Sequence, residues 1–394
     1  MSVSFAYFDH HATTPLCLEA REAWLRAHSE AWMNPSSLYP SAGRSRRLLE
    51  EAREECAELL GCEPARIVFT SGATEGNNAV LRWAASRGGR AVLSAVEHPA
   101  VREPAWQFFG DGGVCELPVD EKGVVLADVL RAELETPGTK PAVVSVMAAN
   151  NETGVLQAWR ETAARCAEHG VPYHCDAAQW IGKRPAAGLA ECAWVTLSAH
   201  KFGGPKGVGV LIIPAGTFSP LRLRAGGPQE SGHRAGTEDY PGVAAMAAAL
   251  AARAGWAADE QARAKASAWR DAFESRLMKH LPGTQVVGSG ALRSETVSMV
   301  IVPRHPQLKW VTRLGERGFC VSTGSACSSG KGNPSPVLQA MGIDAEAMGR
   351  ALRFSAGPET VEADWEGLLE ALLDVWEVLE SGVRDRPKVD LSRL

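Results

Sequence analysis

Long apolar runs are missing from this sequence of 394 residues. No stretch approaches the roughly 18 consecutive apolar residues that a membrane-spanning helix needs, and the Ala-rich stretch 242–251 is short and is followed closely by Arg253. The N-terminal residues also lack the basic region and the apolar core of a signal peptide. We therefore expect a cytoplasmic protein that has no membrane as a partner.

A strong charge of either sign is also missing. The chain has 41 Lys and Arg against 46 Asp and Glu, so its formal net charge is −5. A positive surface is what attracts nucleic acids and anionic membranes, so we expect no nucleic acid as a partner. Hydrophobic residues make up 45% of the chain, which is typical of a globular protein, and the chain is long enough to bury a large core.

Paired cysteine motifs are absent as well. The nine cysteines are scattered and form no CxxC pair. Zinc clusters and dithiol redox sites depend on such spacing, so we predict no metal site. In a reducing cytosol most of these thiols are expected to be free and buried as small hydrophobic groups.

Short β-rich runs alternate with helical patterns through the middle of the chain. Several runs are apolar throughout, as expected for strands that are covered on both faces. The strand candidates are 66–70, 90–94, 142–147, 172–175, 194–197 and 207–213, with helix-like stretches such as 75–86 and 159–169 between them. This alternation predicts an α/β domain with a mainly parallel sheet.

The composition changes after about Thr237. An Ala- and Arg-rich helical stretch extends to about His280, and a last amphipathic helix lies near 363–379. Three further strand candidates lie between these helices, at 296–302, 319–322 and 351–355. We predict a large domain over residues 15–255 and a smaller α+β domain formed by residues 1–14 and 256–394.

Two predicted strands end in residues that suit a cofactor, at the sheet edge where open α/β folds bind ligands. Lys201 closes the sequence Ser198-Ala-His-Lys201 before a glycine-rich turn. Such a lysine forms a Schiff base if its pKa is depressed, and is otherwise a surface lysine. Asp176 can hold a pyridinium nitrogen protonated, and Gln179 can donate to a ring oxygen. Alternatively, Asp176 caps the helix that follows.

Two more groups follow strands at the same edge. The segment Thr70–Asn78 joins a strand to a helix, and its small residues leave N–H groups free for an anion. It matches neither the Walker A motif nor the dinucleotide fingerprint, and the alternative is a plain helix start. His98 either stacks on a planar cofactor and shuttles a proton, or is structural. These groups, together with Asn150 and Asn151, all lie at predicted strand ends. Their shared position indicates a ligand-binding site more strongly than any one motif does.

Cys327 differs from the other cysteines in its surroundings. It lies in a segment from about 322 to 336 that is rich in Gly, Ser and Pro. Such a segment does not pack as a core and is expected to be mobile. Cys327 is therefore either a candidate nucleophile or an incidental thiol in a linker.

Together these motifs resemble the cysteine desulfurases, the NifS-like branch of the class V aminotransferase family of fold type I pyridoxal 5'-phosphate (PLP) enzymes. The resemblance runs nearly end to end. It is carried by Asp9–Pro15, Asn34–Ser37, Thr70–Asn78, Glu97-His98, Asn150–Glu152, His174–Gln179, Ser198–Lys201, Arg234–Thr237, Gly324–Ser329 and Leu352–Ser355. The resemblance implies the PLP-dependent transferase fold, with a mainly parallel mixed sheet in the large domain and the mobile Cys327 loop on the small one.

The resemblance also implies a role for each site residue. Lys201 would bind PLP as a Schiff base and move protons at the substrate, and Cys327 would take the sulfur of L-cysteine as a persulfide, releasing L-alanine. His98 would stack on the ring and help to form the thiolate. The remaining cofactor residues would be Ala73, Thr74, Asn151, Asp176, Gln179, Ser198, His200 and, from the other subunit of a homodimer, Thr237. Substrate would be bound by Asn151, by Asn34 and by Arg353, which would clamp its carboxylate.

Three hypotheses for the function stay open at this point. The first is the desulfurase, whose long loop favours delivery of sulfur to a protein acceptor such as an iron–sulfur scaffold or a sulfur carrier. The second is another class V PLP enzyme, a selenocysteine lyase, a C–S lyase or an aminotransferase, with Cys327 incidental. The third is a non-catalytic PLP-binding partner in sulfur relay. His10 and His11 stand where relatives often have less ionisable residues. They bear on entry to the site or on the partner surface, so the identity of the substrate and of the acceptor stays open.

Overall fold

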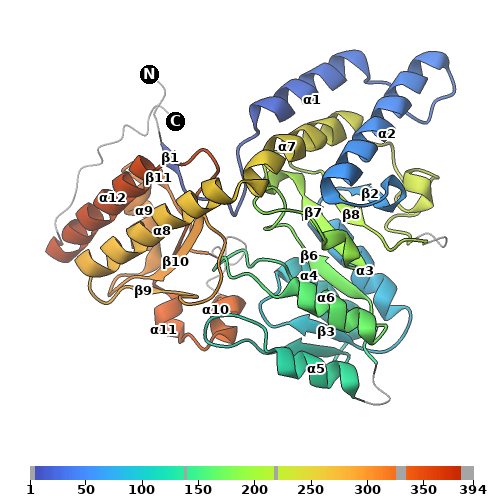
Figure 1. Cartoon of the computed structure of the whole chain (residues 1–394). Helices are drawn as coiled ribbons and strands as arrows, with labels where there is room; N and C mark the ends of the chain where they lie inside the picture. The colour runs from blue at the N-terminus through green and yellow to red at the C-terminus, as the bar shows by residue number, and fades with distance from the viewer. Residues whose placement is uncertain (1–4, 137–139, 217–220, 325–333, 383–394) are drawn as a thin grey trace.

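A mixed, mostly parallel sheet forms the centre of the larger part of the molecule (Figure 1). The computed structural model describes residues 5–136, 140–216, 221–324 and 334–382. Within these ranges the sheet has seven strands in the order β2-β8-β7-β6-β5-β3-β4. They are β2 (Ile67–Thr70), β3 (Ala91–Ser94), β4 (Val114–Leu117), β5 (Val143–Ser145), β6 (Tyr173–Asp176), β7 (Trp194–Ser198) and β8 (Gly209–Ile212). Only β8 among these described strands runs antiparallel to both of its neighbours, so the predicted sheet type is confirmed.

Helices cover both faces of this sheet because its strands are apolar on both sides. One face packs on α3 (Ala73–Ala85) and α4 (Pro99–Phe109). The other packs on α5 (Ala127–Glu135), α6 (Trp159–Glu168) and α7 (Tyr240–Ala258). Beyond α7 lie α1 (Leu18–Glu30) and α2 (Pro40–Leu60), whose buried alanines allow close packing on the Ala-rich α7.

A second hydrophobic core lies in the smaller part of the molecule. Its sheets join β12 (Ala351–Ser355), β10 (Val297–Ile301) and β9 (Gln285–Val286), and β1 (Ala6–Tyr7) to β11 (Phe319–Cys320). The helices around them are α8 (Glu260–His280), α9 (Gln307–Gly315), α10 (Pro336–Ala340), α11 (Ala345–Met348) and α12 (Glu362–Ser381). Trp365, Leu368 and Leu372 on α12 are buried in this core, as its amphipathic pattern predicts.

The two cores divide the long Ala- and Arg-rich stretch. It is not one helix: Asp259 accepts hydrogen bonds from the N–H groups of Gln261 and Ala262 and so begins α8 directly after α7 ends. Helix α7 belongs to the first core and α8 to the second, which Phe8 joins from the N-terminal side. The domain limits 15–255 and 1–14 with 256–394 stay a prediction. Within the described ranges, no helix is both long and apolar enough to cross a membrane.

Candidate functional site

The carboxyl ends of the central strands enclose a cavity of about 260 Å³. Asp176 ends β6, Ser198 ends β7, and the loop after β2 leads into α3 beside them. Parallel strands present their carboxyl ends at one edge, so residues far apart in sequence meet there. The lining includes every predicted cofactor residue except Thr237, namely Ala73, Thr74, His98, Asn151, Asp176, Gln179, Ser198, His200 and Lys201.

Lys201 lies in this cavity and not on the open surface. It ends a single 3-10 turn, Ala199–Lys201, that follows β7 directly. Its Nζ donates to the main-chain oxygens of His11, at 2.6 Å, and Ala12, at 3.0 Å. The N-terminal segment thus holds the amine at the cavity wall.

Asp176 is fixed by two hydrogen bonds. Its Oδ1 accepts from the N–H of Ala178 at 3.0 Å, as a turn cap would, and its Oδ2 accepts from Nδ2 of Asn77 at 2.8 Å. Asn77 in turn contacts His174, whose pKa burial lowers to about 4, so that imidazole is neutral. No role was predicted for Asn77; the available signal was an amide one turn into the helix that the segment Thr70–Asn78 begins.

The start of α3 lies beside Ser198, and a helix N-terminus favours a negative charge. Oγ of Ser198 accepts from the N–H of Ala73 at 2.8 Å, and Thr74 is exposed beside it. A Cβ at Gly72 would lie 3.1 Å from Ser198 Oγ. The loop before α3 can approach β7 this closely because Gly72 has no side chain. His200 completes the group; burial and then repulsion by Lys201 lower its pKa to about 4, which keeps it neutral.

His98 caps α4 as well as lining the cavity. Its Nδ1 accepts from the N–H of Ala100 at 3.1 Å, so the neutral ring carries its proton on Nε2. Burial lowers the pKa of His98, while nearby Asp176 opposes that shift. Protonation at Nδ1 would break the cap, which is a further reason for the ring to stay neutral.

Gln179 is oriented by its neighbours. Its Nε2 donates to the main-chain oxygen of His11 at 2.8 Å, and its Oε1 accepts from Nζ of Lys183 at 2.5 Å. Burial, followed by repulsion from Lys201, lowers the pKa of Lys183 well below its usual value. The buried lysine was not expected from the sequence, and it sets which end of the amide faces the cavity.

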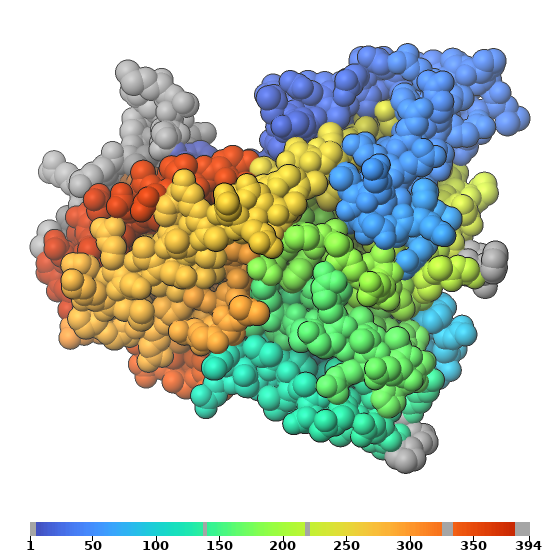
Figure 2. All heavy atoms as spheres, viewed as in Figure 1, coloured from blue at the N-terminus to red at the C-terminus, as the bar shows by residue number. Residues whose placement is uncertain are grey.

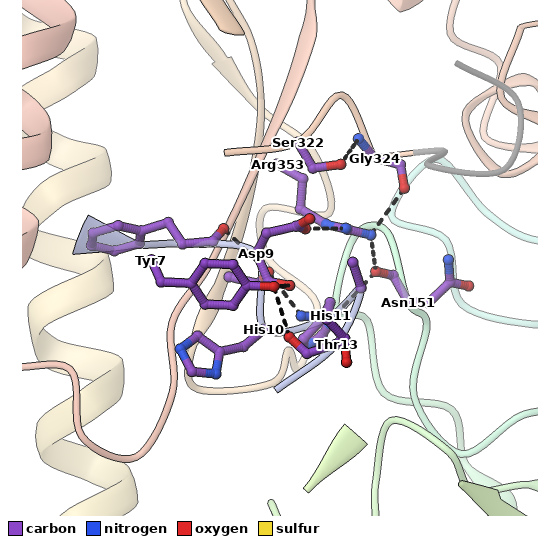
Figure 3. A network of polar contacts seen from close by, with 12 residues as sticks. Tyr7, Asp9, His10, His11, Thr13, Asn151, Ser322, Gly324 and Arg353 are labelled. Carbon is purple, nitrogen blue, oxygen red and sulfur yellow. Dashed lines mark hydrogen bonds and ion pairs between the residues drawn. The ribbon is translucent and has the colours of Figure 1, made fainter. Parts of the chain in front are cut away.

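A second cavity of about 290 Å³ adjoins the first and shares Ala12, His98, Asn151 and Lys201 with it. Arg353, on β12, lines this cavity and is 2% exposed. Its Nη2 donates to Oδ1 of Asp9 at 2.6 Å, and its Nη1 donates to the main-chain oxygens of Asn151 and Gly324, both at 2.9 Å (Figure 3). These partners fix the orientation of the guanidinium in the cavity that Lys201 also lines.

Two buried carboxylic acids also line the second cavity. Burial raises the pKa of Glu97 well above its usual value, and repulsion by Asp176 adds to this effect. Burial also raises the pKa of Glu152, whose Oε2 accepts from Oγ of Ser335 at 2.6 Å. The wall is therefore less negative than its residue types suggest.

Two of the described residues predicted for the site are not brought into either cavity. Asn34 is exposed, and its Oδ1 accepts from the N–H of Ser36 at 2.9 Å. Thr237 is also exposed and lines neither cavity of this single chain. Cys327 lies outside the described residues.

Comparison with known proteins places this geometry in a family. The sequence model of the family described as Aminotransferase class-V matches residues 6–368. A cysteine desulfurase of Trichormus azollae is 36% identical over 385 residues, which cover 96% of this chain and 94% of the relative. The chain therefore belongs to the class-V aminotransferase family, in the branch whose members are named cysteine desulfurases.

Solved structures agree with this assignment. A NifS-like protein superposes with a TM-score of 0.85 at 30% identity, covering 95% of this chain and all of that chain (100%). A structure described as SspA in complex with cysteine superposes with a TM-score of 0.75 at 27% identity, covering 90% of this chain and 100% of the other. The fold type I prediction and the resemblance seen in the sequence are confirmed.

Proposed function

We propose that this protein is a PLP-dependent cysteine desulfurase that converts L-cysteine to L-alanine and takes up the sulfur as a persulfide on Cys327. The observation that carries the proposal is the meeting of Lys201, Asp176 and Arg353 in two adjoining cavities. An amine can hold an aldehyde cofactor, a carboxylate can pair with its pyridine nitrogen, and a guanidinium can bind the carboxylate of an amino acid. The names of the relatives, and the cysteine bound to SspA, agree with it.

The donor set of the first cavity fits PLP. Main-chain N–H groups at the start of a helix of 13 residues, with hydroxyls beside them, suit a phosphate. Asp176 keeps lone pairs for a pyridinium N–H while Asn77 and Ala178 hold it in place. Gln179 Nε2 carries two N–H groups, and the one not given to His11 would donate to the ring oxygen. When bound, PLP supplies a conjugated system that stabilises negative charge on an attached amino acid. The phosphate would be held by Ala73, Thr74, Ser198 and His200.

The other residues bind and orient the substrate. Lys201 would hold the cofactor and carry a proton to and from the substrate α-carbon. His98 would cover the ring face, and Asn151 would lie between cofactor and substrate. Arg353 would bind the carboxylate, because a guanidinium presents parallel N–H groups to two oxygens.

The sulfur step needs a thiolate within reach of the second cavity. The described residues Gly324 and Pro336, on either side of the Cys327 segment, both line that cavity. Cys327 is three residues from Gly324, so the chain spans at most about 11 Å between them. The Cys327 thiolate would attack the substrate sulfur, and an S–S bond would form between the two sulfur atoms. The C–S bond of the substrate would break, and the electron pair of that bond would stay on the substrate carbon, which would take a proton. Cysteine and a thiol thus give alanine and a persulfide without an external oxidant or reductant.

Product analysis tests this function directly. We expect purified protein with PLP to form alanine from L-cysteine, and intact-mass spectrometry to find one added sulfur atom located on Cys327 after digestion. Cys327→Ala should abolish the added sulfur, and Lys201→Ala should abolish the turnover. Cys62→Ala, which alters a partly buried thiol at the end of α2, should change neither quantity. A keto acid product, or undiminished turnover in Cys327→Ala, would contradict the proposal.

We further propose that the enzyme acts as a homodimer and passes its sulfur to a protein acceptor, an iron–sulfur scaffold or a sulfur carrier. Large apolar side chains are exposed on α1 and on the segment before α2, including Trp32, Leu38 and Tyr39, and a second copy would cover them. Thr237 would then reach the phosphate site of the other subunit. The cytoplasmic location stays a prediction.

A further inference from the structure

His11 is hydrogen-bonded at both main-chain polar atoms and at one ring nitrogen. Its N–H donates to Oγ of Ser355 at 3.0 Å. Its main-chain oxygen accepts from Nζ of Lys201 at 2.6 Å and from Nε2 of Gln179 at 2.8 Å. Its ring Nδ1 lies 3.1 Å from the main-chain oxygen of Asn151. One residue therefore contacts β12 of the small domain and three residues of the candidate site.

The tautomer of His11 follows from its ring partner. A carbonyl oxygen only accepts, so Nδ1 must carry the proton and donate to Asn151. The same oxygen of Asn151 also accepts from Nη1 of Arg353 at 2.9 Å. A carbonyl oxygen has two lone pairs, so His11 and Arg353 together fill it and lie side by side on it (Figure 3).

The charge state of His11 is set by its surroundings. Burial is the largest cause that lowers its pKa well below the usual value, followed by repulsion from Lys183 and Arg353, and a smaller one from Lys201. The hydrogen bond to Asn151 acts in the opposite direction without reversing the shift. A neutral ring is what the position requires, because a cation there would repel the guanidinium beside it.

We propose that His11 is a positioning residue that fixes Arg353 relative to Lys201, and so sets the spacing at which the site accepts the carboxylate and the amino group of an α-amino acid. This inference rests on the proposed function, in which these two side chains meet the two ends of the substrate. Its contact with Lys201 is made by the main chain, and its contact toward Arg353 is made by the ring. Removal of the ring therefore leaves the main-chain contact with Lys201 in place and acts through the Asn151 oxygen that Arg353 shares.

A double-mutant cycle tests the coupling. The dissociation constant of L-alanine is measured from the absorbance change of PLP bound to the full-length protein. We expect His11→Ala to raise it about 10-fold, because Arg353 would lose the equivalent of about one hydrogen bond to the carboxylate. In the Arg353→Ala background the effect should be less than about twofold, because it passes through that residue. His11→Asn, whose side-chain N–H donates to Asn151, should restore most of the affinity. His10→Asn, at a neighbouring ring that packs on Tyr7 and Gly357, should leave the dissociation constant unchanged.

Equal effects of His11→Ala in both backgrounds, or none in either, would overturn the proposal. A second readout needs no cofactor: the imidazole ¹⁵N shifts of histidine-labelled protein, assigned with His11→Asn, should show a neutral ring protonated on Nδ1 from about pH 5 to about pH 8. An Nε2–H tautomer would also overturn it. Failure of the proposed function has a different signature, because L-cysteine would then yield no alanine while the cycle and the tautomer keep their expected values.

Discussion

Asp9 holds Arg353 through an ion pair. The two side chains form an ion pair at 2.6 Å, in which the arginine side chain is 2% and the aspartate 22% exposed. Breaking a buried pair leaves a charge without compensation, although an asparagine oxygen still accepts from Nη2. We expect Asp9→Asn to destabilise the fold by about 1–2 kcal/mol and to raise KM for L-cysteine about 10-fold, measured by urea unfolding and by initial rates.

The exposed pair of Arg44 and Glu30 provides the control for this experiment. Both side chains are about half exposed, at 51% and 45%. Surface pairs of this kind contribute at most about 1 kcal/mol, so Glu30→Gln should change neither stability nor KM appreciably. If Asp9→Asn behaves like Glu30→Gln, Arg353 is held by its main-chain partners and not by the carboxylate.

Glu97 makes stability depend on pH. Burial and Asp176 raise its pKa well above 4.5, while one oxygen accepts from the N–H of Met147 at 2.7 Å. The native state therefore binds more protons than the unfolded state once the pH exceeds that usual value, and the free energy of unfolding falls as pH rises toward the native pKa. We expect Glu97→Gln, neutral at every pH, to flatten this fall in urea unfolding curves collected from about pH 5 to about pH 8. An unchanged slope would show that the carboxyl group is ionised in the native protein.

The residues that the sequence could identify are those at strand ends. Asp176, Ser198 and Lys201 each follow an apolar run, so their place in the fold could be predicted from local pattern alone. Asn77 bonds Asp176 across 99 positions and Asp9 bonds Arg353 across 344. Such partners depend on how distant segments meet, which no local pattern contains.

Gly209 is where three elements of the central sheet meet. It begins β8 and pairs with Thr70 of β2 and Ser198 of β7. A Cβ there would lie 2.5 Å from Cα of Gly72 and also clash with the main-chain oxygen of Leu197. Because both are backbone atoms, relief requires the loop before α3 to move. We expect Gly209→Ala to weaken PLP binding about 10-fold and to cost about 1–3 kcal/mol of stability, measured by cofactor titration and urea unfolding.

Gly255 in α7 is the matched control for the change at Gly209. A Cβ there meets nothing within 4 Å, and alanine is the better helix former. Gly255→Ala should stabilise the protein by about 0.5–1 kcal/mol without affecting the cofactor. Unchanged PLP binding in Gly209→Ala would mean that the loop before α3 does not hold the phosphate.

Elements were predictable from the sequence where burial is two-sided. The central strands are apolar on both faces, and the predicted runs coincide with β2, β3, β5, β6, β7 and β8 to within a few residues. Strand β4 at the edge of the sheet is only partly buried along most of its length and was not predicted. Helices α1 and α2 were also not predicted. The buried positions of α1 are all alanine, and those of α2 include Ser45 and Arg53 among alanines, so few large apolar residues mark either helix.

At the scale of the whole molecule, α1 and α2 form one edge, at the upper right of Figure 2, with α7 beneath them. The apolar surface there includes Leu38, which is 95% exposed, and Trp32, which is 69% exposed. Large apolar side chains that stay exposed are typical of an interaction surface. In the proposed dimer this surface and Thr237 act together, because the partner copy would cover the apolar surface and would also supply its Thr237 to the phosphate site.

The double change Trp32→Ser and Leu38→Glu should therefore yield a monomer that also loses PLP affinity, since each phosphate site would lack its second-copy Thr237. Analytical ultracentrifugation and cofactor titration measure the two effects separately. Thr237→Val should retain the dimer and lower PLP affinity about 10-fold, the value of roughly one hydrogen bond to a charged group. Leu308→Glu, at a leucine 60% exposed on α9, should change neither quantity. A monomeric double variant that binds PLP as tightly as the parent would separate assembly from cofactor binding and place the complete phosphate site within one chain.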